Sequence, residues 1–206
     1  MRRGSYRLAD WHVVQNIDMT SPIFLDAESF LNVVAATPLV SIDLVIVRGG
    51  TEVLLGLRSN RPAQGSWFVP GGRVLKNEHM QHALVRISEV ELGLGKMFQN
   101  GALQSTLLGV FEHFYADCFA GDANVPTHYV VIAQVVHVAA DFMLPRHDAQ
   151  HAALRWWPLA DAANSDQVHN HTKDYFSHLY RAVGHAEAAQ PTEALRTFSI
   201  KKATGS

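Results

Sequence analysis

Residues 70–94 read PGGRVLKNEHMQHALVRISEVELGL, and this stretch decides the fold prediction. The proline and two glycines at its start allow a tight turn whose backbone can approach a ligand closely. From Glu78 to Leu92, apolar residues recur at spacings of three and four, which predicts a helix with one buried face made by Met80, Ala83, Leu84, Ile87 and Val90. Gly93 stands where such a helix would end. The stretch therefore predicts a glycine turn that leads into an amphipathic helix.

The charged residues of this stretch resemble a Nudix box that lacks two of its usual acids. The spacing of the box is kept by a glycine, an acid, an arginine and a final glycine, which are Gly72, Glu78, Arg86 and Gly93. The box normally has glutamates at the positions of Ile87 and Val90. Glu91 is therefore what remains of the three carboxylates that gather metal ions in the family.

The reduced box predicts an incomplete metal site. Ile87 is expected to face the core, so the helix offers Glu91 alone. A hard cation needs several oxygen ligands, and Glu91 with the turn carbonyl of Gly71 leaves such an ion short of ligands. A further ligand must then come from outside the box. The alternative is a plain amphipathic helix whose solvated surface charges include Glu78, Arg86 and Glu89.

Composition fits one globular domain with a sizeable core. The chain has 206 residues, of which 48% are hydrophobic and 17% are charged. A net charge of -2 gives no electrostatic case for nucleic acid. The sequence has no apolar run of membrane-spanning length and no signal-peptide core, so no membrane partner is expected. A single cysteine, Cys118, excludes an internal disulfide and suits a reducing cytosol, which predicts a cytoplasmic protein.

The order of predicted elements indicates an α/β fold. Residues 1–22 are expected to be an N-terminal extension, residues 23–185 the domain, and residues 186–206 a tail. Asp26 is predicted to cap a helix through Val34, with Leu25 and Phe30 as a hydrophobic staple. Strands are predicted at 39–47, 52–58, 67–69, 103–115, 128–138 and 154–157, with a helix at 173–183. This order predicts an α/β sandwich and not a doubly wound sheet. The resemblance to the Nudix box implies the Nudix fold, in which mixed β-sheets are sandwiched between α-helices.

Segments outside the box resemble one branch of the Nudix superfamily, the GDP-mannose mannosyl hydrolases. The similar segments are TPLVSID at 37–43, RSNRPAQGSWFVPGGR at 58–73, and shorter stretches at 113–115, 127–131, 150–156 and 166–170. The resemblance implies hydrolysis of GDP-mannose or a related GDP-hexose to GDP and free hexose. It further implies that water attacks the anomeric carbon with inversion, and that the enzyme is a homodimer.

The resemblance also implies a complete metal site. The branch has a glutamine ligand in a late loop, and the matching position in this chain is Gln150. One Mg²⁺ is then held by the Gly71 carbonyl, Glu91 and Gln150, and is completed by phosphate oxygens and water. Mn²⁺ is the alternative ion.

A diphosphate leaving group needs its charge to be neutralised by the site. Its developing negative charge can be neutralised by metal and arginines, so the general acid of an ordinary glycosidase is dispensable. The candidates are Arg58, Arg73 and Arg86, because guanidinium binds phosphate in a bidentate manner. Arg86 could equally be a structural partner of Glu78.

The attacking water needs a base that is neutral near pH 7, and imidazole meets that need. His151 lies beside Gln150 and matches the base of the branch. An alternative interpretation pairs His147 with His151 on one helical face as zinc ligands, although no further ligands accompany them. After His151 the chain continues Ala-Ala-Leu where the branch has an acidic pair, so the charge of this loop differs.

Further residues are candidates for binding the substrate. Asp43 stands among apolar strand residues, and a buried acid is costly unless paired, so a role with sugar hydroxyls or with the base is predicted; the alternative is an exposed aspartate. The resemblance places His113 and Tyr129 near the leaving group or the sugar, although both could be packing groups. It gives a role in guanine nucleotide binding across the dimer interface to Phe24, Leu25 and Phe30.

Two other functions compete with this interpretation. An ordinary Nudix pyrophosphohydrolase would attack phosphorus and release GMP and a sugar phosphate, but the loss of acids at positions 87 and 90 argues against it. A non-catalytic nucleotide-sugar sensor would have kept the fold and lost turnover. The joint presence of Glu91, Gln150 and His151 disfavours a sensor, since binding alone does not require a base.

Overall fold

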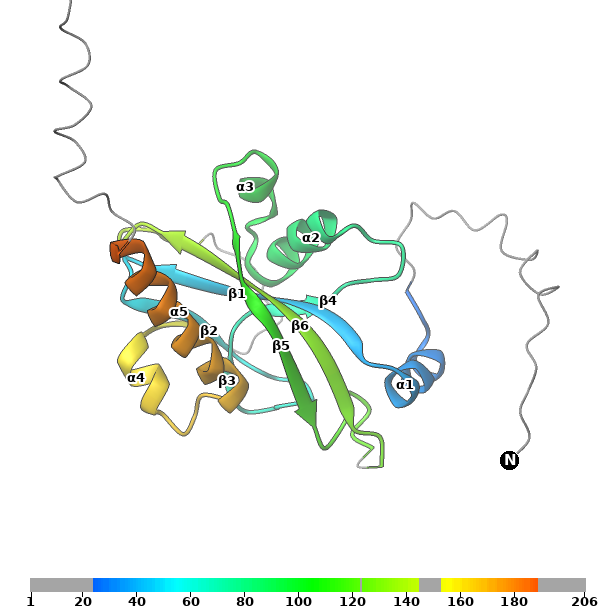
Figure 1. The fold of residues 1–206 in the computed structure, drawn as a ribbon. Helices are drawn as coiled ribbons and strands as arrows, with labels where there is room; N and C mark the ends of the chain where they lie inside the picture. Colours follow the sequence, from blue (N-terminus) through cyan, green and yellow to red (C-terminus); the bar gives the residue numbers. More distant parts are fainter. Residues whose placement is uncertain (1–23, 123, 145–152, 189–206) are drawn as a thin grey trace, which may run out of the picture.

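The computed structural model describes residues 24–122, 124–144 and 153–188, and Figure 1 shows their arrangement. Residues 1–22, most of the predicted tail, and the predicted site residues Gln150 and His151 lie outside the described residues. In chain order the elements are α1 (Ala27–Ala36), β1 (Leu39–Arg48), β2 (Glu52–Leu57), β3 (Trp67–Phe68), β4 (Gly71–Arg73), α2 (Met80–Leu92), α3 (Gly95–Gln99), β5 (Thr106–Tyr115), β6 (Thr127–Val138), β7 (Leu154–Pro158), α4 (Leu159–Asn164) and α5 (Asn170–Ala188).

A mixed seven-stranded sheet forms the centre of the molecule. Its main path runs β3-β2-β1-β6-β5, while β4 pairs with β1 and β7 pairs with β2. Strands β1 and β6 are parallel over the whole length of β1, from Leu39 opposite Tyr129 to Arg48 opposite Val138. The other strand pairs are antiparallel. Strand β1 reads as an almost continuous apolar run because both faces of the sheet are covered there.

Successive side chains of β1 point into two different cores. Ile42, Leu44 and Ile46 pack with α2 and α3 on one face of the sheet. Val45 and Val47 pack with α4 and α5 on the other face. Figure 1 shows these helix pairs on opposite sides of the sheet. The predicted α/β fold, with a mixed sheet between helices, is thus confirmed.

Helix α2 is the helix predicted from residues 78–92, and it begins two residues later than expected. Gly93 ends it in the left-handed region, with φ of 67°, as its sequence position indicated. Its buried stripe consists of Ala83, Leu84, Ile87, Ser88 and Leu92. The prediction that Met80 and Val90 share the buried face is wrong, because they are 40% and 38% exposed. Met80 opens the helix, and Val90 lies beside the stripe.

Strand β4 brings the glycine turn against the central strand, and this pairing positions the site. In the antiparallel register of β4 and β1, Gly71 lies opposite Asp43 and Gly72 lies opposite Ile42. A Cβ at Gly71 would meet the Asp43 carboxylate and would lie 2.8 Å from the carbonyl oxygen of Ile42. Only glycine allows β4 to approach β1 this closely.

The remaining predicted elements are present, with shifted ends. Asp26 caps α1 by accepting a 2.9 Å hydrogen bond from the Ser29 amide. Helix α5 starts before the predicted helix and continues to Ala188, past the predicted domain boundary at residue 185. Within the described part of the chain, no helix has the length and apolar character needed to cross a bilayer.

Candidate active site

One pocket, of about 280 Å³, brings together most of the residues that the sequence singled out. It lies where β1, β4, β5 and β6 meet the loop after β2 and the end of α2. The predicted site residues in its lining are Asp43, Arg58, Gly71, Arg73, Glu91, His113 and Tyr129. Residues from six different segments thus converge on one cavity, which is the arrangement expected of a ligand site.

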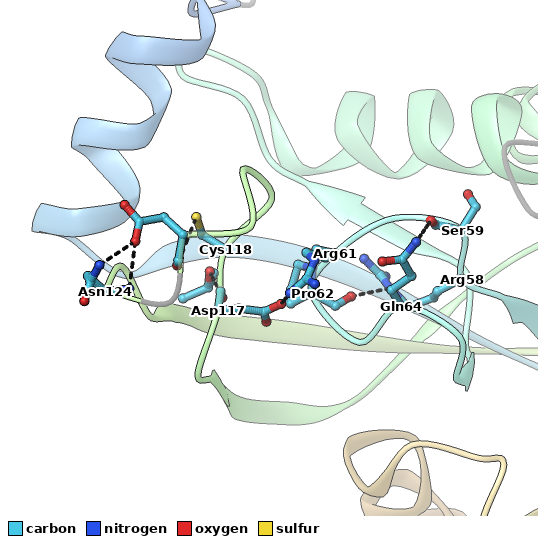
Figure 2. A network of polar contacts seen from close by, with 10 residues as sticks. Arg58, Ser59, Arg61, Pro62, Gln64, Asp117, Cys118 and Asn124 are labelled. Atoms are coloured by element: carbon cyan, nitrogen blue, oxygen red, sulfur yellow. Dashed lines mark hydrogen bonds and ion pairs between the residues drawn. The ribbon is translucent and has the colours of Figure 1, made fainter.

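The loop after β2 holds Arg58 at the wall of this pocket. Its guanidinium Nε donates a 2.8 Å hydrogen bond to the carbonyl of Pro62, and Gln64 donates one of 2.9 Å to the carbonyl of Ser59. Arg61 reaches across to Asp117, with 2.7 Å between Nη1 and Oδ2. Figure 2 shows this loop beside the segment that carries Asp117. Hydrogen bonds within the loop therefore hold the side chain of Arg58 in place without a bound ligand.

Arg73 is held by helix α1. Its guanidinium carbon lies 3.6 Å from the centre of the Phe30 ring, and Phe30 packs on Phe119 at 4.8 Å between ring centres. Burial lowers the pKa of Arg73, Tyr129 counteracts this, and the charge of Arg86 adds to the lowering. The ordinary pKa of arginine is so high that the side chain stays cationic. Arg58 and Arg73 thus give the pocket a positive wall.

Arg86 occupies a different environment. Its Nε and Nη2 atoms donate hydrogen bonds of 2.6 and 2.8 Å to the two carboxylate oxygens of Glu78, and Nη2 also donates to the carbonyl of Arg73 at 2.7 Å. Burial alone would raise the pKa of Glu78, but the hydrogen bonds from Arg86 and Leu75 hold that pKa below its usual value. Arg86 does not line the pocket, so its phosphate-binding role stays a prediction beside a clear structural one.

Glu91 and the glycine turn supply a partial set of metal ligands. Glu91 projects from the last turn of α2, and both Glu91 and Gly71 line the pocket. Ile87, one turn earlier, is only 1% exposed and packs in the core, so its position offers no second carboxylate. Among the described residues, no group of three or more His, Cys, Asp or Glu side chains could hold a metal ion. The donors present fit a Mg²⁺ ion that takes another ligand from elsewhere.

Asp43 is buried at the back of the pocket, on the face of β1 that meets α5. Its Oδ2 accepts a 2.6 Å hydrogen bond from the hydroxyl of Tyr175, which also lies 3.2 Å from Nε2 of His113. Burial raises the pKa of Asp43 to about 6, although the Tyr175 hydrogen bond and the charge of Arg58 act in the opposite direction. The carboxyl group is satisfied by its partner and not by solvent.

Two further histidines lie beside His113. His171 is at the start of α5, and His169 directly precedes the helix. The rings of His113 and His171 are stacked, with 4.1 Å between centres and 5° between planes, and His169 lies 4.9 Å from His171. Burial, assisted by the neighbouring imidazoles, lowers the pKa of His113 to about 3. Burial likewise lowers the pKa of His169 to about 4, with His171 and Arg58 adding to the effect. At neutral pH these two rings carry no charge.

Sequence reasoning missed Tyr175, His171 and the pocket residue Tyr115 as parts of this site. Tyr175 lies in a predicted helix, where an aromatic residue is typical of the core, and nothing in its sequence neighbourhood points to Asp43. His169 lies in the segment at 166–170 that carried part of the family resemblance, but that segment assigned it no role. A distant hydrogen bond leaves no local signal in a single sequence.

The other predicted residues are placed as follows. Phe24 and Leu25 are 75% and 49% exposed and do not line the pocket, whereas Phe30 contacts Arg73. Their proposed nucleotide role requires a second copy of the chain. His147, Gln150 and His151 lie outside the described residues, so the base, the third metal ligand and the alternative zinc pair remain predictions.

Comparison with known proteins supports the fold and part of the function. The family model of the NUDIX domain matches residues 37–180. The low-salt glycan biosynthesis protein Agl8 of Haloferax volcanii is 43% identical over 123 residues, which are 60% of this chain and 72% of that protein. A MutT NUDIX hydrolase structure from Burkholderia pseudomallei superimposes with a TM-score of 0.52 at 28% identity, covering 69% of this chain and 98% of that one.

A more distant structure shows the same fold. The NUDIX domain of Shewanella oneidensis NrtR, solved in complex with ADP ribose, has a TM-score of 0.54 at 17% identity. The match covers 86% of this chain and 99% of that one.

Proposed function

The chain belongs to the Nudix family, and from that membership we propose that it hydrolyses GDP-mannose or a related GDP-hexose to GDP and free hexose. Water attacks the anomeric carbon with inversion, and Mg²⁺ is the cofactor. The activity is assigned to residues 23–185, with residues 1–22 as an extension and 186–206 as a tail. The observation that carries the proposal is the pocket, which combines two arginines with a single box carboxylate.

The arrangement of charge favours attack at carbon. A Nudix enzyme that attacks phosphorus normally gathers several metal ions on acids of the box helix, but here Ile87 is buried and Glu91 is the pocket carboxylate from that helix. Departure of a whole diphosphate requires charge neutralisation more than it requires an activated phosphorus. Arg58 and Arg73 meet that need at the pocket wall, and bound Mg²⁺ would supply further neutralisation through Glu91, Gly71 and Gln150.

The polar end of the pocket suits a sugar. Asp43 and the neutral ring of His113 can accept hydrogen bonds, and the hydroxyl groups of a hexose can donate them. His151 acts as the base that takes a proton from the attacking water. The name of the Haloferax volcanii relative also points to glycan synthesis, which consumes activated sugars.

The exposed apolar surface supports a homodimer. Val110 and Phe114 on the edge strand β5 are each 62% exposed, and Val40 on β1 is 42% exposed. Val40 and Glu112 both lie opposite Val130, so their side chains point to the same face of the sheet. Val110 and Phe114 lie two residues before and after Glu112 on β5, so they point to that face as well. A second copy that covers this face would bring its own Phe24 and Leu25 to the assembly.

The test is hydrolysis of GDP-mannose with Mg²⁺ in ¹⁸O-labelled water, followed by mass analysis of both products. Attack at carbon places the label in the free hexose and leaves GDP unlabelled. Label in GMP or in a sugar phosphate would show ordinary Nudix chemistry at phosphorus and would overturn the proposal. Absence of turnover with GDP-mannose, GDP-glucose and other GDP-hexoses would favour a binding protein.

Two substitutions test the proposed roles of metal ligand and base. Glu91→Gln and His151→Gln are each expected to lower kcat by at least about 100-fold, because they remove a metal ligand and the base. Circular dichroism melting curves serve to verify that both variants fold. Near-normal turnover in folded variants would defeat the site assignment.

A further inference from the structure

The hydroxyl of Tyr175 links two side chains of the pocket from behind. Tyr175 is fully buried on α5, and its hydroxyl contacts Oδ2 of Asp43 and Nε2 of His113. Asp43 and His113 line the pocket, whereas Tyr175 does not. A hydrogen-bonding effect of Tyr175 on a bound ligand must therefore act through those two side chains.

The two distances decide where the hydroxyl proton points. A separation of 2.6 Å between Tyr175 and Asp43 is typical of a hydroxyl that donates to a carboxylate, while the 3.2 Å to His113 is at the long end for an N–H···O bond. A phenol has one proton to donate, so with that proton given to Asp43 its oxygen can only accept from His113. Nε2 of His113 must then carry a proton.

The ring of His113 is neutral and restrained, so its other nitrogen is an acceptor. Burial and the neighbouring imidazoles keep the ring uncharged at neutral pH, and a neutral ring protonated at Nε2 has a lone pair at Nδ1. His171 stacks flat on one face of the ring, and Phe68 lies edge-on at 6.0 Å. These contacts oppose a ring flip that would exchange the two nitrogens.

We propose that Tyr175 is a positioning residue that fixes Asp43 and His113 as two hydrogen-bond acceptors toward the pocket, through Oδ1 of the aspartate and Nδ1 of the histidine. Oδ1 already faces Gly71 of the pocket wall. Two fixed acceptors select a ligand group that carries hydroxyl donors. The identification of this group as the hexose rests on the proposed function.

This assignment gives the pocket two chemically different kinds of polar group. Arg58 and Arg73 present only donors and attract phosphate. Asp43 and His113 present only acceptors and repel phosphate oxygens, but they match sugar hydroxyls. The donation chain from His113 to Tyr175 to Asp43 would thereby fix which pocket groups face the sugar of a nucleotide sugar and which face its phosphates.

The first test is the protonation state of His113, measured by long-range ¹H–¹⁵N NMR on the full-length protein without substrate. The signals of this ring are assigned by their disappearance in His113→Gln. The expected result is a neutral ring with a hydrogen-bonded proton on Nε2, and loss of that hydrogen-bonded signal in Tyr175→Phe. A proton on Nδ1, or an unchanged Nε2 signal in Tyr175→Phe, would overturn the proposal.

The second test asks whether the bond serves the sugar. With the GDP-hexose that the enzyme turns over, Tyr175→Phe is expected to raise KM about tenfold, since one well-oriented hydrogen bond is lost. The inhibition constant for GDP is expected to change less than about twofold. GDP has no hexose, and groups that share no partner affect each other's binding energies only slightly. Equal weakening of GDP and GDP-hexose would overturn the sugar assignment.

A matched core variant separates positioning from simple loss of packing. Phe176 is buried next to Tyr175 on α5. Its side chain has no polar group, so it cannot form a hydrogen bond with Asp43 or His113. Phe176→Leu is expected to lower the melting temperature while leaving the Nε2 signal of His113 and the KM unchanged. If Phe176→Leu altered both as strongly as Tyr175→Phe, the positioning role would be refuted. Failure of turnover in the wild type would contradict the proposed function while leaving the NMR result decisive.

Discussion

Asp43 shows that a buried acid in the pocket lining carries a cost to the fold. Its pKa is about 6 in the folded protein and 3.8 in the reference state, so the unfolded chain releases the proton first as pH rises. Stability linked to this group is full below pH 3.8 and is lost as pH rises through 6. The difference amounts to about 3 kcal/mol at neutral pH, since one pKa unit corresponds to about 1.4 kcal/mol.

Asp43→Asn removes this titration and should abolish the loss of stability with rising pH that Asp43 causes. We expect the free energy of unfolding of the variant, relative to the wild type, to be higher at pH 8 than at pH 4 by up to about 3 kcal/mol. The measurement is urea unfolding at both pH values in the presence of EDTA. A stability difference that does not vary with pH would show that Asp43 titrates normally.

The ion pair of Arg86 and Glu78 is predicted to be mainly structural. The side chain of Glu78 is 2% exposed, so removing Arg86 would leave a buried carboxylate without its charged partner. We expect Arg86→Gln and Glu78→Gln each to cost about 3 kcal/mol, and the double variant to cost much less than their sum. Urea unfolding of the four proteins measures this coupling.

The pair of Arg61 and Asp117 provides the matched control, because these side chains are 50% and 25% exposed. The same double-mutant cycle there should give a coupling below about 1 kcal/mol. Coupling of equal size in both cycles would mean that burial does not strengthen the Glu78 pair. A loss of turnover in Arg86→Gln without a loss of stability would instead support its phosphate-binding role.

At the scale of elements, β4 depends on having no side chain at Gly71. We expect Gly71→Ala to force β4 away from β1, because the added Cβ would lie 2.8 Å from the Ile42 carbonyl. Displacing the turn by a fraction of an ångström should lower kcat by about 100-fold. Gly72→Ala should be milder, since its Cβ meets the adjustable Ile87 side chain at 3.2 Å. Kinetics and thermal melts of both variants measure this, and equal effects would contradict the register argument.

The elements that sequence alone predicted are those with a strong local signal. The apolar run of β1 and the Asp26 cap of α1 are confirmed, as is the glycine that ends α2. Strand β4 was missed because Gly-Gly-Arg has no alternating apolar pattern and pairs only through its backbone. The short helices α3 and α4 were missed because one or two turns give too few residues for a helical period to show.

The residues of the candidate site also differ in whether the sequence alone could predict them. Residues near the glycine turn, such as Arg58 and Glu91, could be predicted because they lie in contiguous motifs. Tyr175 could not, because its partner Asp43 is 132 residues away in the chain. Contacts of this kind are set by how α5 packs on the sheet, and a single sequence has no record of that packing.

At the scale of the whole molecule, the apolar residues that the described part of the chain leaves exposed on one sheet face predict the oligomeric state. Val40, Val110 and Phe114 are exposed on the same face, and β5 ends the sheet. A stable homodimer buries about 1,600 Å² in total, with a more apolar centre than the remaining surface. Covering this face with a second copy would remove these side chains from water, whereas in a monomer they stay exposed.

We therefore expect the wild-type chain to sediment as a dimer and Val110→Glu with Phe114→Glu to sediment as a monomer. Two buried carboxylates on each side of a symmetric interface would repel and lose hydration. Ala160→Glu, on exposed α4 at the other face of the sheet, is the control and should remain dimeric. Analytical ultracentrifugation over a range of concentrations gives the masses. A wild-type monomer at all concentrations would exclude the interface, and the pocket would then have to bind nucleotide without a partner's Phe24 and Leu25.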